Sequence, residues 1–308
     1  MLLRPDILVL GGGGVLGEAW MMGVLAGIED AADLDLRECE AFVGTSAGSI
    51  VAAHLVAGRS PRRPSALGTE IEPASAHPAS ALVVGALTGA RRASELALAA
   101  WSPLAPLALS AAAPGGALVR AAGLVAIPRP HATLSELRRR VAEYGARFDG
   151  RLRVTSVDRK RGRRVVFGSP GAPDASVADA VAASCSVPWL FAPVTIDGRE
   201  YVDGGVWSAT NLDIAPAGRD THVLCLNPIA GVRGAHALLA LARNLARSAV
   251  SVEALALRRR GALVRTVHPN LECVAAMDAD FMDPEPRRLV LAAGYRQGLA
   301  FGARRPGG

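Results

Sequence analysis

The chain has 308 residues, of which half are hydrophobic and a fifth are charged, and its formal net charge is +6. A chain of this length buries roughly three quarters of its unfolded surface, so it folds without disulfides or a structural metal. The composition excludes a collagen-like chain, a disordered protein and a protein with several membrane spans. Short basic runs without interleaved aromatic residues argue against nucleic-acid binding, and four widely spaced cysteines indicate reduced thiols and a cytoplasmic location.

Two strand–turn–helix units are predicted at the start of the chain. A short apolar run at 7–10 leads through four glycines into 18–31, where large apolar residues are spaced three or four apart. A second apolar run at 41–44 leads through the sequence Gly-Thr-Ser-Ala-Gly-Ser into a helix at 50–57. Apolar runs that end in glycine turns and continue with helical spacing are typical of alternating strands and helices.

Residues 60–130 form an insertion within a single domain that spans 1–308. This segment is rich in Ala, Pro, Ser and Leu, and the alternation of strand and helix disappears within it. Residues 96–119 carry no charge and are long enough to span a membrane, but their prolines and glycines argue against one continuous helix. The interpretations are an apolar cap over a pocket, a peripheral membrane contact through 96–119, and a true span.

From residue 133 the alternation of elements returns. The patterns predict a helix after Thr133, a hairpin of 152–157 with 164–167, a short helix at 176–184, a hairpin of 194–196 with 200–202, a strand at 222–226 and a helix at 235–259. Thr133 and Glu136 have capping-box spacing, and Asp197-Gly198 is typical of a tight hairpin turn. The apolar face predicted for the last helix is Leu238, Leu241, Leu245 and Val252. Strands interleaved with helices indicate an α/β sandwich.

The pentapeptide around Ser46, Gly-Thr-Ser-Ala-Gly, is a candidate nucleophile elbow. It lies between a predicted strand and a predicted helix, and its glycines, Gly44 and Gly48, permit the sharp turn that exposes the serine hydroxyl. The helix that follows offers backbone N–H groups and the positive end of its dipole. The same pattern also occurs in ordinary glycine turns.

The glycine-rich run at 11–17 has two interpretations. Gly12, Gly14 and Gly17 match the dinucleotide-binding fingerprint, which also needs an acidic residue at the end of a second strand about twenty positions later. Asp33 and Asp35 do not lie at a convincing strand end. Alternatively, the glycines expose N–H donors to the negative oxygen of an acyl-transfer transition state.

Asp203-Gly204-Gly205 follows the second hairpin and places a carboxylate on a tight turn. The glycine loop, the Gly-x-Ser-x-Gly sequence and Asp-Gly-Gly, in this order, resemble the patatin-like phospholipase family over most of the chain. The segments 23–25 and 183–193 and residue Asn211 are also similar to that family.

The resemblance implies a three-layer α/β/α sandwich of patatin type, an apolar helical cap insertion and a Ser-Asp dyad without histidine. Ser46 would attack an acyl carbonyl and Asp203 would accept its proton. The implied oxyanion donors are the N–H groups of Gly12, Gly13 and Gly14, and the motif glycines are Gly17, Gly44, Gly48, Gly204 and Gly205. The implied substrate is an acyl lipid, cleaved as by a phospholipase A or lipid esterase, with no metal and no cofactor.

One residue departs from the family pattern, and other functions stay open. Many members carry Lys or Arg where this chain has Leu16. Because leucine has no charge to pair with a phosphate, this difference favours a neutral ester or thioester over a phospholipid as the substrate. The order Ser46, Asp203 and then His222 or His268 also suits a Ser-Asp-His α/β hydrolase. A catalytically silent lipid-binding protein and a nucleotide-binding protein are further alternatives. The sequence predicts neither headgroup, acyl length nor oligomeric state.

Overall fold

The computed structural model describes residues 3–64, 116–231, 237–277 and 281–303. The predicted insertion at 60–130 is therefore described only at its two ends. Most of the uncharged segment at 96–119 lies outside the described residues, and its last four residues begin helix α6 (Gly116–Ala126). The cap and the single-domain boundaries thus stay predictions.

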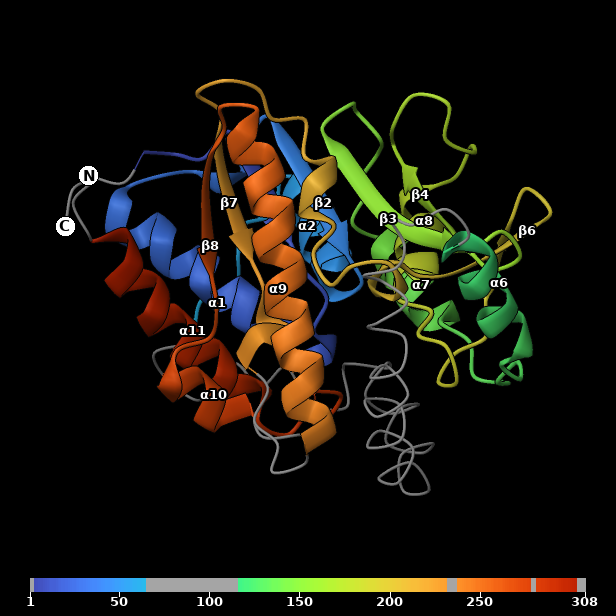
Figure 1. The fold of residues 1–308 in the computed structure, drawn as a ribbon. Helices are drawn as coiled ribbons and strands as arrows, with labels where there is room; N and C mark the ends of the chain where they lie inside the picture. Colours follow the sequence, from blue (N-terminus) through green and yellow to red (C-terminus); the bar gives the residue numbers. More distant parts are fainter. Residues whose placement is uncertain (1–2, 65–115, 232–236, 278–280, 304–308) are drawn as a thin grey trace.

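A mixed β-sheet of eight strands forms the centre of the described structure (Figure 1). The strands are β1 (Ile7–Leu10), β2 (Ala41–Thr45), β3 (Leu152–Asp158), β4 (Arg163–Phe167), β5 (Val194–Ile196), β6 (Arg199–Asp203), β7 (His222–Leu226) and β8 (Leu263–Val267). Their order is β5-β6-β3-β2-β1-β7-β8, and β4 pairs with β3 off this path. Strands β3, β2, β1, β7 and β8 are parallel, so the loops after β1, β2 and β7 meet at one edge.

Helices cover both faces of this sheet. Besides α6, they are α1 (Gly14–Ala32), α2 (Ala47–Val56), α7 (Ser135–Ala142), α8 (Val177–Ser184), α9 (Ala237–Arg259), α10 (Leu271–Met277) and α11 (Arg287–Gly302). Because strand side chains alternate, Leu8 and Leu10 of β1 join the core with α1, α2, α8 and α11, whereas Ile7 and Val9 join a second core with α9. The result is the three-layer α/β/α arrangement (Figure 1).

Helices α1 and α11 pack with their backbones in close approach. A Cβ atom on Gly23 would lie 2.2 Å from the carbonyl oxygen of Leu291, and one on Gly27 would lie 2.2 Å from that of Tyr295. Only glycine fits these positions, which explains the glycine of the 23–25 segment. This packing fixes α1, whose first turn follows the glycine loop.

Most of the elements predicted from the sequence are confirmed. The first strand has the predicted bounds, and both hairpins, α8 and β7 lie where the patterns place them. Asp197 and Gly198 both have positive φ angles, as the predicted hairpin turn requires. Helix α2 begins at Ala47, three residues before the predicted start, because its first turn forms directly after Ser46.

Two predictions about helices are wrong. The capping box at Thr133 does not form, because α7 begins at Ser135 after Leu134, and no side chain caps it. The predicted apolar face of α9 is also incorrect at Val252, which is 64% exposed. The side chains of this helix that pack against the sheet are Val250, Ala254 and Leu257. The other three predicted positions, Leu238, Leu241 and Leu245, lie outside the described side chains.

Candidate active site

Ser46 lies on a sharp turn between β2 and α2. Its backbone has φ 50° and ψ −122°, a sparsely populated conformation, and its side chain makes no capping hydrogen bond to the helix that follows. The turn needs its glycines: a Cβ on Gly48 would lie 1.9 Å from the carbonyl oxygen of Leu10, and one on Gly44 2.5 Å from the Cα of Ser49. The N–H of Ser46 donates to the Ser184 hydroxyl at 2.8 Å, which anchors the elbow to the end of α8.

Strand register brings Asp203 to the same level of the sheet. Strand β3 lies between β2 and β6, with Thr45 opposite Thr155 on one side and Asp203 opposite Ser156 on the other. Ser46 follows Thr45 directly. Two strand spacings correspond to about 10 Å between backbones, a gap that two inward side chains can close.

The Asp203 side chain is completely buried at the end of β6. Its Oδ1 accepts a hydrogen bond from the Gly205 N–H at 2.7 Å, whereas its Oδ2 has no hydrogen-bond partner of ordinary geometry. Burial raises the pKa of Asp203 to about 7, against opposing contributions from the Ser46 hydroxyl and the Gly205 N–H. The Ser46 hydroxyl thus lowers the pKa of this carboxyl, although no hydrogen bond of ordinary geometry joins the two side chains.

The glycine loop after β1 packs directly onto Ser46. A Cβ on Gly12 would lie 3.5 Å from the Ser46 Cβ. The N–H of Gly12 is donated to the carbonyl of Ala209 at 2.8 Å, which corrects the expectation that it is one of the oxyanion donors. The N–H groups of Gly13 and Gly14 donate to none of the described residues. Both N–H groups lie at the N-terminus of α1, the positive end of the helix dipole.

Leu16 does not face this site. Its side chain is completely buried in the larger core, and its N–H donates to the carbonyl of Phe281 at 3.1 Å. A leucine in this position packs the start of α1 against the larger core. Its effect on the choice between a neutral ester and a phospholipid stays a prediction.

Neither of the histidines considered for a triad lies between Ser46 and Asp203. His222 begins β7 at the edge opposite to the site, since β7 runs parallel to β1 and its carboxyl end is Leu226. His268 follows β8, three strands away from β2, and lines a cavity of about 250 Å³ with Val250 and Arg258 of α9. Of the four remaining histidines, His54 bonds the Ser60 carbonyl and His131 is exposed, whereas His77 and His236 lie outside the described residues.

The described residues contain neither a candidate metal site nor a disulfide bond. The residues described in 3–64, 116–231, 237–277 and 281–303 contain no group of three or more His, Cys, Asp or Glu side chains that could hold a metal ion. All four cysteines are buried and unbonded, as the sequence predicts. Burial raises the pKa of Cys39 to about 12, so this thiol stays protonated.

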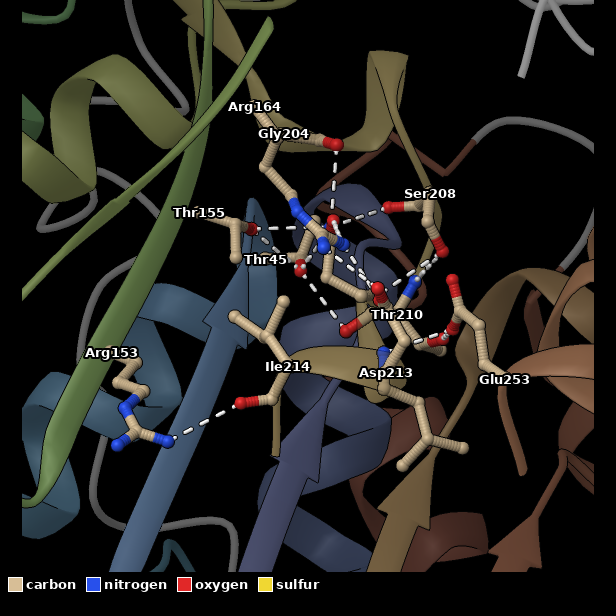
Figure 2. A network of polar contacts seen from close by, with 12 residues as sticks. Thr45, Arg153, Thr155, Arg164, Gly204, Ser208, Thr210, Asp213, Ile214 and Glu253 are labelled. Atoms are coloured by element: carbon tan, nitrogen blue, oxygen red, sulfur yellow. Dashed lines mark hydrogen bonds and ion pairs between the residues drawn. The ribbon is translucent and has the colours of Figure 1, made fainter. Parts of the chain in front are cut away.

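A buried polar network lies between β2, β3 and α9, close to the turns that carry Ser46 and Asp203 (Figure 2). Thr45 and Thr155 share a hydrogen bond of 2.9 Å, and Glu253 of α9 accepts from Thr210 at 2.9 Å. Burial raises the pKa of Glu253. Sequence reasoning did not identify Ser184, although it lies in the 183–193 segment, and the only signal for Glu253 is an acidic residue on a largely apolar helix.

The sequence profile of the family described as patatin-like phospholipase matches residues 8–216. The chain belongs to this family. The match includes the glycine loop, the Ser46 elbow, the Asp203 turn and Asn211, and it ends before β7. A search of curated proteins finds no significant match.

Two solved structures resemble this patatin-like phospholipase chain. The crystal structure of VipD from Legionella pneumophila has a TM-score of 0.46 and 16% sequence identity, and the alignment covers 97% of this chain and 67% of VipD. The crystal structure of the type III effector protein ExoU has a TM-score of 0.39 and 19% identity, and the alignment covers 97% of this chain and 53% of ExoU. The chain therefore spans about two thirds of one protein and half of the other.

Proposed function

We propose that this patatin-like phospholipase hydrolyses acyl esters of lipids with Ser46 as nucleophile and Asp203 as general base, without histidine. The observation that carries the proposal is the pairing of a strained elbow at the half-buried Ser46 with a buried Asp203 carboxyl whose Oδ2 has no hydrogen-bond partner. The influence of the Ser46 hydroxyl on the pKa of Asp203 supports direct proton transfer between them. Among the described residues, no histidine contributes to that pKa shift.

The reaction proceeds through an acyl-enzyme intermediate. The Ser46 Oγ attacks the acyl carbonyl carbon while its proton moves to Asp203 Oδ2. The negative charge that develops on the carbonyl oxygen is stabilised by the N–H groups of Gly13 and Gly14 and by the N-terminal end of α1. The tetrahedral species expels the alcohol, which takes the proton from Asp203, and water then releases the acyl group by the same steps in reverse order.

Burial suits Asp203 to this role. A carboxylate with a pKa of about 7 is a stronger base than an exposed aspartate, and half of it is unprotonated near neutral pH. The complete burial of Asp203 accounts for this raised pKa. A general base works best when its pKa lies near the operating pH.

Fluorophosphonate labelling tests the proposal. We expect a fluorophosphonate probe to label the wild-type protein, with labelling lost in Ser46→Ala, and a long-chain nitrophenyl ester to be hydrolysed in the presence of a chelator. An unlabelled wild-type protein that still binds lipid would favour the catalytically silent alternative. Complete loss of hydrolysis on chelation would contradict the metal-free mechanism.

The exposed apolar side chains of α6 favour contact with a lipid surface. Leu118 is 76% and Val125 53% exposed, and every exposed side chain described on α6 is apolar. The one charged residue, Arg120, is buried against Trp207. The β3–β4 turn, which carries exposed Lys160 and Arg161, packs against α6. Apolar side chains beside cations favour an anionic membrane surface.

This contact is peripheral in the proposal. Within the described ranges, no helix is long and apolar enough to cross a membrane. Leu124 of α6 and Ile127 directly after it pack against Val202 and Val206, which flank the Asp203 turn. A lipid surface bound at α6 would therefore lie close to the loop that carries the proposed base. A cytoplasmic location stays a prediction.

A further inference from the structure

One amide side chain contacts the backbone neighbours of both proposed catalytic residues. Asn211 is completely buried. Its Nδ2 lies 3.1 Å from the hydroxyl of Thr45, which is the residue before Ser46. The same nitrogen lies 3.3 Å from the carbonyl of Gly204, the residue after Asp203. Its remaining acceptors are the carbonyl of Ser208 at 2.8 Å and the Thr155 hydroxyl at 3.3 Å. Figure 2 shows these partners converging from different elements.

Arg164 fixes which way this amide points. Its guanidinium donates to the Asn211 Oδ1 at 3.1 Å and is held in place by two contacts to Asp213, at 2.6 and 2.7 Å. It also lies over the Trp207 ring, 5.2 Å from the centroid. Because a guanidinium only donates, the oxygen must face Arg164 and the two Nδ2 hydrogens must face the acceptors around Thr45 and Gly204.

The backbone around Asn211 is anchored independently. Asn211 has a left-handed backbone, with φ 50° and ψ 38°, a conformation that asparagine tolerates better than most residues. The Glu253 carboxylate accepts from the Thr210 hydroxyl and from the Leu212 N–H, each at 2.9 Å. The residues on both sides of Asn211 are therefore tied to α9, and the amide between them has little freedom.

We propose that Asn211 is a positioning residue of the active site, which sets the separation of the Ser46 hydroxyl and the Asp203 carboxylate by bridging Thr45 and Gly204. This inference rests on the proposed function. No hydrogen bond of ordinary geometry holds Asp203 Oδ2, so the separation of the two side chains depends on how the loops that carry them are held. A misplacement of about 1 Å can reduce turnover by about 10².

The variant Asn211→Asp tests this role with almost no change in shape. It keeps an oxygen for Arg164 but replaces the donor group by an oxygen that faces the carbonyl of Gly204. We expect kcat to fall about 10- to 100-fold while KM changes less than about threefold, because substrate does not contact residue 211. Asn270→Ala is the matched control: its amide oxygen accepts from the Cys273 N–H of α10 at 2.9 Å, and kcat should stay unchanged.

Should Asn211→Asp not fold, Thr45→Val provides a second route. It removes the acceptor next to Ser46 and preserves side-chain volume. We expect kcat to fall several fold and the melting temperature to fall as well, because the Thr45 hydroxyl also bonds Thr155 and the carbonyl of Thr210. Unchanged kcat in either folded variant would overturn the proposal.

A double-mutant cycle separates positioning from a general structural effect. We expect Asn211→Asp to slow fluorophosphonate labelling of Ser46 in the wild-type background but to add less than about threefold in the Asp203→Asn background. Equal fold-losses in both backgrounds would show that Asn211 does not act through the dyad. Failure of the proposed function itself gives a different result, namely wild-type turnover in Asp203→Asn alone.

Discussion

Replacing Asp203 by Asn should make the protein more stable at alkaline pH while it removes most of the activity. In the folded protein, burial raises the pKa of this carboxyl from 3.8 to about 7. Between these two pKa values the folded state holds a proton that the unfolded state has lost, so the free energy of unfolding falls as the pH rises. A difference of roughly 3 pKa units corresponds to about 4 kcal/mol of lost stability above about pH 7.

Asparagine keeps the shape of the side chain but has no charge to desolvate. We therefore expect wild type and Asp203→Asn to have similar free energies of unfolding at about pH 4. At about pH 8 the free energy of unfolding of the variant should be larger by up to about 4 kcal/mol. Denaturant titrations at several pH values measure this difference. Ester turnover should fall by a factor of about 10²–10⁴, the usual loss for a general base.

Asp35 provides a control with the opposite sign. A hydrogen bond from Arg37 lowers the pKa of its carboxyl, so Asp35→Asn should not gain stability as the pH rises. The reasoning about Asp203 would be refuted by an Asp203→Asn variant whose stability difference from wild type is constant between about pH 4 and pH 8. It would equally be refuted by a variant that is less stable than wild type at the alkaline end.

Three further outcomes are expected. The value of kcat/KM should rise with pH through about 7, because Asp203 must lose its proton to act as base, and a profile that falls over this range would contradict the role. The double variant Leu118→Glu with Val125→Glu should bind anionic vesicles about tenfold more weakly or worse, since burying each side chain is worth roughly 1.5–3 kcal/mol. Val252→Glu, at an exposed site on α9, should bind as wild type does. His268→Gln should keep activity within about tenfold, and an inactive, folded variant would revive the triad mechanism.

The sequence predicts the strand that carries the glycine loop and the Ser46 elbow because local chemistry alone determines them. An apolar run such as Ile7–Leu10 is buried on both faces, and the turn after β2 requires glycine at Gly44, where a Cβ would meet the backbone of Ser49. The same holds for the Asp197-Gly198 turn, whose positive φ angles favour these residues. These features depend on contacts within a few residues, whereas Gly48 is required by its close approach to Leu10 of β1.

Predictions that depend on tertiary contacts succeed less well. The Gly12 N–H is taken by the carbonyl of Ala209, nearly two hundred positions away in the chain, and no local pattern reveals it. Leu16 lies in the first turn of α1, where a side chain faces either the site or the core. Its side chain packs into the larger core, and this orientation depends on the elements that surround α1. On α9 the predicted core position Val252 is exposed, whereas Val250, Ala254 and Leu257 are buried, since the sheet determines which side of a long helix is buried.

The pairing of Ser46 with Asp203 illustrates why motif order predicts the members of a site but not their chemistry. The motifs identify both residues, yet what brings them to one level is the register of β3, which pairs with β2 in parallel and with β6 in antiparallel orientation. The pKa of Asp203 depends further on complete burial, which many distant segments create together. Asn211 is visible in the sequence as a residue shortly after Asp-Gly-Gly, but its bridging contacts exist only once both loops have folded around it. The Asn211 and Asp203 variants therefore test the part of the site that the three-dimensional structure supplies.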